Sequence, residues 1–141
     1  MPDLSEHFNH KDFLCQCGTC EGTYRIHLGL VGALEMIWSH FQKPVKIVSG
    51  YRCEAYNEKL EGPKKSFHTR GKAAHIRAEE VPLEELFKFS RTVPELKGRG
   101  FYPQDNFVHV DTRQDESEEW VKEHGKYSPL TPERKKRYNL E

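Results

Sequence analysis

Apolar side chains recur at helical spacing in two segments of the chain. In residues 30–41 they stand three and four positions apart, a spacing that buries one face of a helix. These positions are Leu30, Val31, Leu34, Ile37, Trp38 and Phe41. Pro44 marks the end of this helix, because proline disfavours helical backbone in the residue before it. Residues 82–92 repeat the pattern and predict a second amphipathic helix, with Pro82 in its first turn.

Short runs rich in β-branched and aromatic residues predict strands. The runs are residues 45–49, 73–78, 100–102 and 106–112. The last two flank the turn at Pro103-Gln104-Asp105, and we expect them to pair as a hairpin. Elsewhere the pattern indicates short helices at residues 53–60 and 118–124, and a loop at residues 62–65.

Strands interleaved with helices indicate an α+β fold, a small and mainly antiparallel sheet with helices packed on one side. A chain of 141 residues is long enough to close a single core. We therefore predict one domain over residues 1–126, with a cysteine-bearing N-terminal lead-in. Residues 127–141 contain two prolines and the run Arg134-Lys135-Lys136-Arg137. This composition predicts a basic, flexible and poorly packed tail.

The charge balance argues against two classes of partner. Lys plus Arg and Asp plus Glu number 22 each, so the formal net charge is +0. A neutral chain has no electrostatic basis for binding nucleic acid or an anionic membrane. No apolar run approaches the length of a membrane span. We expect a monomer with neither kind of partner.

Histidine carries the strongest chemical signal in the chain. His68 and His75 are seven residues apart, and His109 lies in a distant predicted strand, on the same strand face as Asp111. Neutral imidazole is a common zinc ligand, and three protein ligands leave a fourth position open for water. The alternative is that these three are ordinary surface or core histidines, since the chain has eight.

The four cysteines form a second candidate metal site. Cys15, Cys17 and Cys20 are closely spaced, and Cys53 would complete a set of four sulfur ligands. Such clusters in a cytosolic chain favour metal over disulfide. The usual pair of Cys-x-x-Cys knuckles is absent, so three interpretations stay open: a structural metal, a disulfide or free thiols.

Two segments together resemble the M15 zinc peptidases of bacterial cell-wall metabolism. They are Ser66-Phe67-His68-Thr69-Arg70-Gly71-Lys72-Ala73-Ala74-His75 and Phe107-Val108-His109-Val110-Asp111, and the upstream residues 43–53 and Tyr56-Asn57 fit the same family. The resemblance runs from about His7 to Arg113. It implies the hedgehog/DD-peptidase fold and a Zn2+ ion bound by His68, His75 and His109. It also implies a peptidoglycan stem peptide as substrate, cleaved by a carboxypeptidase or an endopeptidase.

The resemblance implies roles for four further residues. Family members use an acidic general base a few positions before the last histidine ligand; Asp105 is the nearest candidate here, and Asp111 is the alternative. Asp105 is otherwise a turn residue, and Asp111 otherwise braces the ligands from behind. Arg52 would bind the carboxylate of a peptide substrate, or else form a structural salt bridge. Ser66 would contact substrate, or else bond the loop backbone.

The chain departs from the family pattern at two places. His75 stands where the family has Asp, and residues 61–65 replace the usual Gly-Gly turn. The first departure bears on catalysis and leaves three hypotheses. The chain is a zinc peptidase, a catalytically weak or inactive metal-containing binding module of the same fold, or a domain stabilised by metal at the cysteines with an empty histidine site.

The N-terminus bears on where such a peptidase would act. The first six residues lack the basic and apolar regions of a signal peptide. We therefore expect synthesis in the cytoplasm, with the cell wall reached by phage-type or other release.

Overall fold

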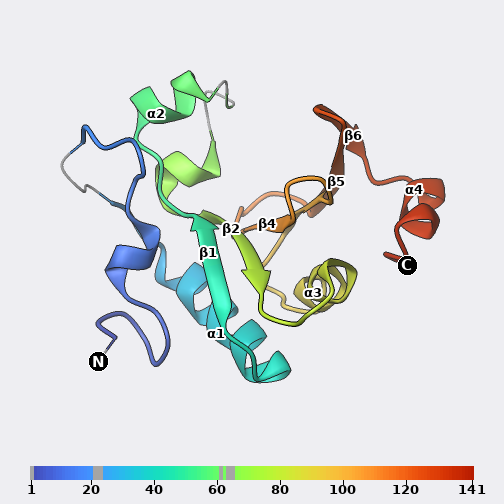
Figure 1. The fold of residues 1–141 in the computed structure, drawn as a ribbon, viewed down its shortest axis with the longest axis horizontal. Coiled ribbons are helices and arrows are strands. Elements are labelled where there is room, and N and C mark those ends of the chain that lie inside the picture. Colours follow the sequence, from blue (N-terminus) through green and yellow to red (C-terminus); the bar gives the residue numbers. More distant parts are fainter. Residues whose placement is uncertain (1, 21–23, 61, 63–65) are drawn as a thin grey trace.

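A sheet of six strands forms the centre of the computed structural model, which describes residues 2–20, 24–60, 62 and 66–141 (Figure 1). The strands are β1 (Val45–Ser49), β2 (Ala73–Ala78), β3 (Gly98–Tyr102), β4 (Phe107–Asp111), β5 (Glu118–Glu123) and β6 (Lys126–Pro129). Their order across the sheet is β1-β2-β4-β3-β5-β6. All neighbours are antiparallel except β3 and β5, so the predicted α+β fold with a mainly antiparallel sheet is confirmed.

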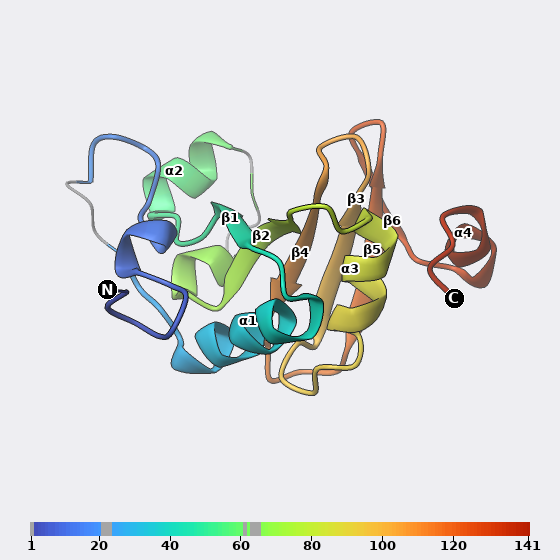
Figure 2. The same cartoon turned by 60° about the horizontal axis from the view of Figure 1, so that its bottom comes forward.

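The two longest helices, α1 (Leu28–Phe41) and α3 (Leu83–Ser90), pack side by side on one face of the sheet (Figure 2). The core lies between these helices and the strands. Its helix residues include Leu30, Leu34, Ile37, Leu86 and Phe87, and its strand residues include Ile76, Phe101, Val108, Val110 and Val121. The spacing of apolar residues predicts both helices, because residues three and four positions apart lie on the one helix face that packs against the sheet.

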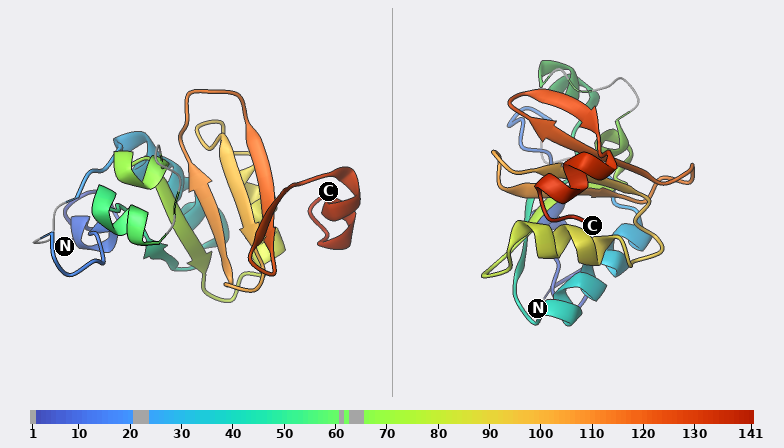
Figure 3. Two further views of the ribbon diagram at one scale, coloured as in Figure 1. Left: turned by 90° about the horizontal axis from the view of Figure 1, so that it is seen from above. Right: turned by 90° about the vertical axis from the view of Figure 1, so that its right-hand side faces the viewer.

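Four short helical segments complete the described structure. They are the 3-10 turns η1 (His10–Phe13) and η2 (Phe67–Arg70) and the helices α2 (Glu54–Lys59) and α4 (Pro132–Arg137). Helix α2 lies on the side of the sheet away from α1 and α3 (Figure 3). The loop predicted at residues 62–65 lies outside the described residues, apart from Gly62. No helix in the described ranges has the length and apolar character needed to cross a bilayer.

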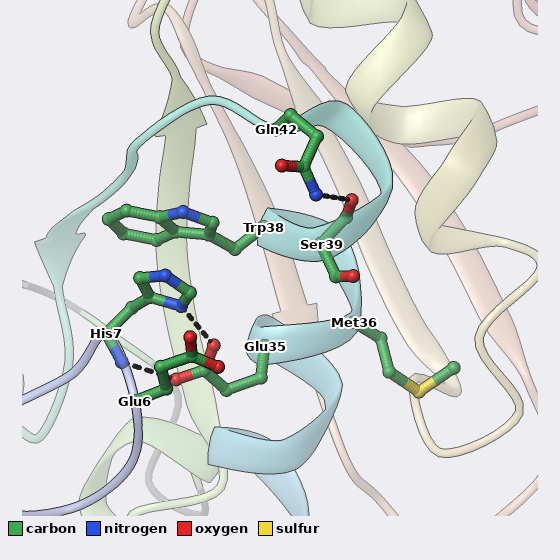
Figure 4. Close-up of a pocket in the computed structure, with 7 residues that line it drawn as sticks. All are labelled: Glu6, His7, Glu35, Met36, Trp38, Ser39 and Gln42. Carbon is green, nitrogen blue, oxygen red and sulfur yellow. Dashed lines mark hydrogen bonds and ion pairs between the residues drawn. The ribbon is translucent and has the colours of Figure 1, made fainter.

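The N-terminal lead-in is attached to α1 through His7 (Figure 4). The backbone N–H and Nδ1 of His7 each lie 2.7 Å from the carboxylate of Glu35, and the Ser5 hydroxyl donates to the same carboxylate. The imidazole also stacks on Trp38, with ring centroids 4.2 Å apart. Phe8, the next residue, is buried in the core. These contacts bring the cysteine-bearing segment that follows back toward the sheet.

Residues 118–123 form a strand, so the helix predicted over 118–124 is wrong. The charged residues of this segment suit a helix, but β3 offers an unpaired edge, and β5 adds to it in parallel. Trp120 lies against Gly100, where a Cβ atom would be 2.5 Å from the indole nitrogen. That nitrogen donates to the Tyr102 hydroxyl at 3.2 Å. Pairing and packing across the sheet have overridden local propensity.

Residues 127–141 contain more structure than their composition predicts. Strand β6 pairs with β5, and Thr131 caps α4 by accepting a hydrogen bond from the backbone of Arg134 at 3.3 Å. Tyr138 packs against Phe101, and Leu140 is fully buried in the core. The Thr-Pro-Glu sequence at residues 131–133 is a helix start that the basic run after it obscures.

The burial of Leu140 leads to a stability prediction. Leu140→Ala should lower the free energy of unfolding by about 2–5 kcal/mol, because it removes a buried side chain and leaves a cavity. Leu28→Ala is the matched control, since that leucine is 70% exposed and should change stability little. Denaturant unfolding of both variants measures the difference. Equal, small effects would mean that the C-terminal residues do not contribute to the core.

Candidate active site

The three histidines identified in the sequence converge on one point. His68 lies in η2, His75 in β2 and His109 in β4, and β2 and β4 pair so that His75 and His109 stand directly opposite each other. Each offers a ring nitrogen, and these nitrogens lie within 4.8 Å of one another. All three side chains are buried. Because side chains alternate along a strand, His109 faces away from α1 and α3 while Val108 faces the core.

Hydrogen bonds orient two of the imidazoles. Nδ1 of His68 lies 2.8 Å from the carbonyl oxygen of Gly50 and must donate, because a carbonyl can only accept. The Asp111 carboxylate orients the ring of His109 in the same way, because it accepts a hydrogen bond from Nε2 of His109 at 2.8 Å. The lone pair of His68 Nε2 thereby faces Nε2 of His75, and that of His109 Nδ1 is left for another partner. Acceptors of this kind behind a histidine are typical of metal sites.

Asp111 is the charged group behind the site. It is fully buried, and Arg113 donates to both of its oxygens at 2.8 Å. Burial opposes ionisation of Asp111, but the hydrogen bonds from Arg113 and His109 outweigh it and hold the pKa of the carboxyl well below its usual range. The carboxylate therefore stays ionised and fixes the ring of His109.

The three imidazoles are held in the neutral form. Burial lowers the pKa of each of them, and the mutual repulsion of the rings lowers it further for His68 and His75. A neutral imidazole has the free lone pair that a metal ligand needs. Burial and clustering thus prepare these residues to bind a cation.

His75, the residue that replaces the family's Asp, fits a zinc site by distance. Its Nε2 lies 3.1 Å from Nε2 of His68. Tetrahedral zinc with bonds of about 2.1 Å would hold two nitrogens roughly 3.4 Å apart. The ring is fixed by stacking on Phe107, with centroids 4.1 Å apart. Its Nδ1 lies 3.5 Å from the Arg52 guanidinium, so the three neutral imidazoles stand beside a positive charge.

The histidines line a cleft of roughly 1170 Å³. Its walls include Tyr56, Tyr102, Trp120, Lys122 and Tyr127. Arg52 also faces it, and within the described ranges its side chain donates to Ser49 at 3.3 Å and toward Nδ1 of His75 at 3.5 Å. Among the described residues Arg52 has no carboxylate partner. It therefore does not form the structural salt bridge that was its alternative role. A half-buried guanidinium in a cleft is suited to a carboxylate ligand.

The other predicted site residues lie at different depths. Asp105 is in the turn after Pro103, on the rim of the cleft, and pairs with Lys122 at 3.7 Å. Ser66 is buried, and its hydroxyl accepts from the backbone N–H of His68 at 3.2 Å, which shapes the loop. The four cysteines gather in a separate group at the turn that follows Arg52.

Sequence reasoning missed several residues of the site, among them Arg113, Trp120 and Lys122. Arg113 continues the alternation of His109 and Asp111, a signal that is present in the sequence. Trp120 and Lys122 fall in the segment whose composition predicts a helix, so their place in the cleft could not be seen. The error in the secondary structure of residues 118–124 therefore hid one wall of the site.

Comparison with known proteins agrees with this geometry. A family model described as Peptidase M15 matches residues 6–111. Peptidoglycan L,D-endopeptidase MepK of Escherichia coli K12 is 35% identical over 100 residues, which cover 67% of this chain and 50% of that protein. A probable peptidoglycan L,D-endopeptidase MepK of Haemophilus influenzae is 36% identical over 73 residues, covering 48% of this chain and 39% of that protein. The chain spans about half the length of the E. coli relative. It belongs to the M15 peptidase family.

Proposed function

We propose that this chain is a zinc-dependent peptidase that cleaves peptide stems of peptidoglycan, as an endopeptidase. The observation that carries the proposal is the convergence of three buried, neutral imidazoles within 4.8 Å at a cleft that also holds Arg52. The names of the relatives, peptidoglycan L,D-endopeptidases, support the substrate class and favour an endopeptidase over a carboxypeptidase.

His68, His75 and His109 would hold the zinc ion, which when bound supplies a Lewis acid and acidifies water. The chain's own residues orient the imidazoles and bind the substrate. The Gly50 carbonyl and Asp111 hold two of the imidazoles in place. Arg52 binds a carboxylate of the stem peptide, and the aromatic walls of the cleft limit access of bulk water.

Of the two acidic candidates, Asp105 is the better placed to act as the general base. Asp111 is fully enclosed and already accepts from His109 and Arg113, so it has little capacity to exchange a proton with a substrate. Asp105 is on the rim and partly exposed, with Lys122 as its ion-pair partner. General base catalysis needs a carboxylate that faces the reacting water, and Asp105 lines the same cleft as the three histidines.

A second candidate function is a metal-containing binding module without catalysis. It is favoured by His75, which replaces a negatively charged ligand with a neutral one. The site then has no negatively charged ligand to balance the positive charge of a zinc ion, and Arg52 adds further positive charge nearby.

His75→Asp separates the two functions. A carboxylate would restore a negatively charged ligand, so we expect hydrolysis of purified muropeptides to rise at least about tenfold, equivalent to ~1.4 kcal/mol in the barrier. His75→Asn is the control, since it has the same size as the aspartate variant without the charge. If wild type and His75→Asp both bind zinc and neither cleaves, the binding module is the correct function.

Arg52→Ala tests the substrate carboxylate. Loss of a charged hydrogen bond of about 1.5–3 kcal/mol should lower kcat/KM by roughly 10- to 150-fold while zinc content and melting temperature stay close to wild type. Arg52→Lys keeps the charge but not the planar fork and should recover part of the loss. A large fall in melting temperature with unchanged kcat/KM would instead assign Arg52 a structural role.

A further inference from the structure

The four cysteines meet at one point, although they come from two separate parts of the chain. Cys15, Cys17 and Cys20 lie between η1 and α1, and Cys53 immediately precedes α2. Their sulfur atoms lie within 4.8 Å of one another, and those of Cys17 and Cys53 are 3.8 Å apart. Cys15 is buried and the other three are half-buried.

We propose that these four thiolates bind a structural zinc ion, separate from the histidine site. A tetrahedron with zinc–sulfur bonds of about 2.3 Å has sulfur–sulfur edges of about 3.8 Å, which matches the Cys17–Cys53 distance. Four sulfur ligands leave no open position for water, which is the arrangement of structural rather than catalytic zinc. This proposal does not depend on the peptidase activity.

Hydrogen-bond donors point at the sulfur atoms. The backbone N–H of Cys53 lies 3.3 Å from Sγ of Cys15, and that of Tyr56 lies 3.4 Å from Sγ of Cys53. Both the N–H and the hydroxyl of Thr19 donate to Sγ of Cys17 at 3.4 Å. Donors in these positions stabilise negative charge on sulfur and orient the ligands, as outer partners do at metal sites.

The site would fasten the N-terminal segment to the turn that carries Arg52. The backbone N–H of Tyr51 donates to the Phe13 carbonyl at 2.9 Å, and the Gln16 amide donates to the Val48 carbonyl at 2.9 Å. These two bonds hold the segments together beside the cysteines. Because Cys53 follows Arg52 directly, a metal there fixes the backbone from which the guanidinium extends into the cleft.

The test uses the full chain with His68→Ala as background, so that the histidine site is disabled. This variant, loaded with cobalt, should show sulfur-to-cobalt charge-transfer absorption, and its zinc should protect the thiols from iodoacetamide. Adding Cys17→Ser should remove the absorption and one zinc ion per chain by mass spectrometry. Tyr24→Phe, in the same region of the chain but without sulfur, is the control and should retain both.

Chelation gives a readout that needs no cysteine variant. In the His68→Ala background, removing zinc should lower the melting temperature strongly and expose the thiols, because the metal's binding free energy contributes to folding. The proposal is overturned if cobalt gives no thiolate absorption, if the thiols alkylate freely while zinc is bound, or if intact mass shows a disulfide between any two of them.

Discussion

The antiparallel pairing of β2 with β4 is the contact on which the site depends. Ala74 pairs with Val110 and Ile76 with Val108, and these four side chains are buried in the core. The residues between them, His75 and His109, therefore face the cleft together. A slip of one residue would turn one imidazole into the core and a valine or alanine into the cleft. The core thus sets the register, and the register sets the site.

The buried Asp111 is the second requirement. It lies beside Gly98 on β3, where an added Cβ atom would collide with the carboxylate oxygens. Only a residue without a side chain leaves room for the carboxylate and its partner Arg113. Strand β3 therefore provides the space in which the Asp111 carboxylate is buried with its hydrogen bonds satisfied. His109 is held by this charge through its Nε2, so the orientation of one of the three clustered imidazoles depends on it.

Much of this could be predicted from the sequence. The spacing of apolar residues locates α1 and α3, and the alternation along residues 107–111 places His109 and Asp111 on one face. The role of β5 could not be predicted, because the residues of Glu118–Glu123 have helical propensity and the edge that recruits them is formed by a distant segment. The burial of Leu140 was equally hidden, since a single leucine after a basic run carries no periodic signal.

The position of β5 has a consequence for the physical behaviour of the domain. The family match ends at Asp111, but β3 would be left with an open edge if the sheet ended there. An unpaired strand edge recruits other chains and promotes aggregation. Strand β5 covers that edge, and Glu119 fastens it through ion pairs to Arg91 and Arg99, both at 2.8 Å. The residues after the matched region thus move the open edge of the sheet from β3 to β6, a strand of four residues that begins with lysine and ends with proline, which are features that discourage edge-to-edge pairing.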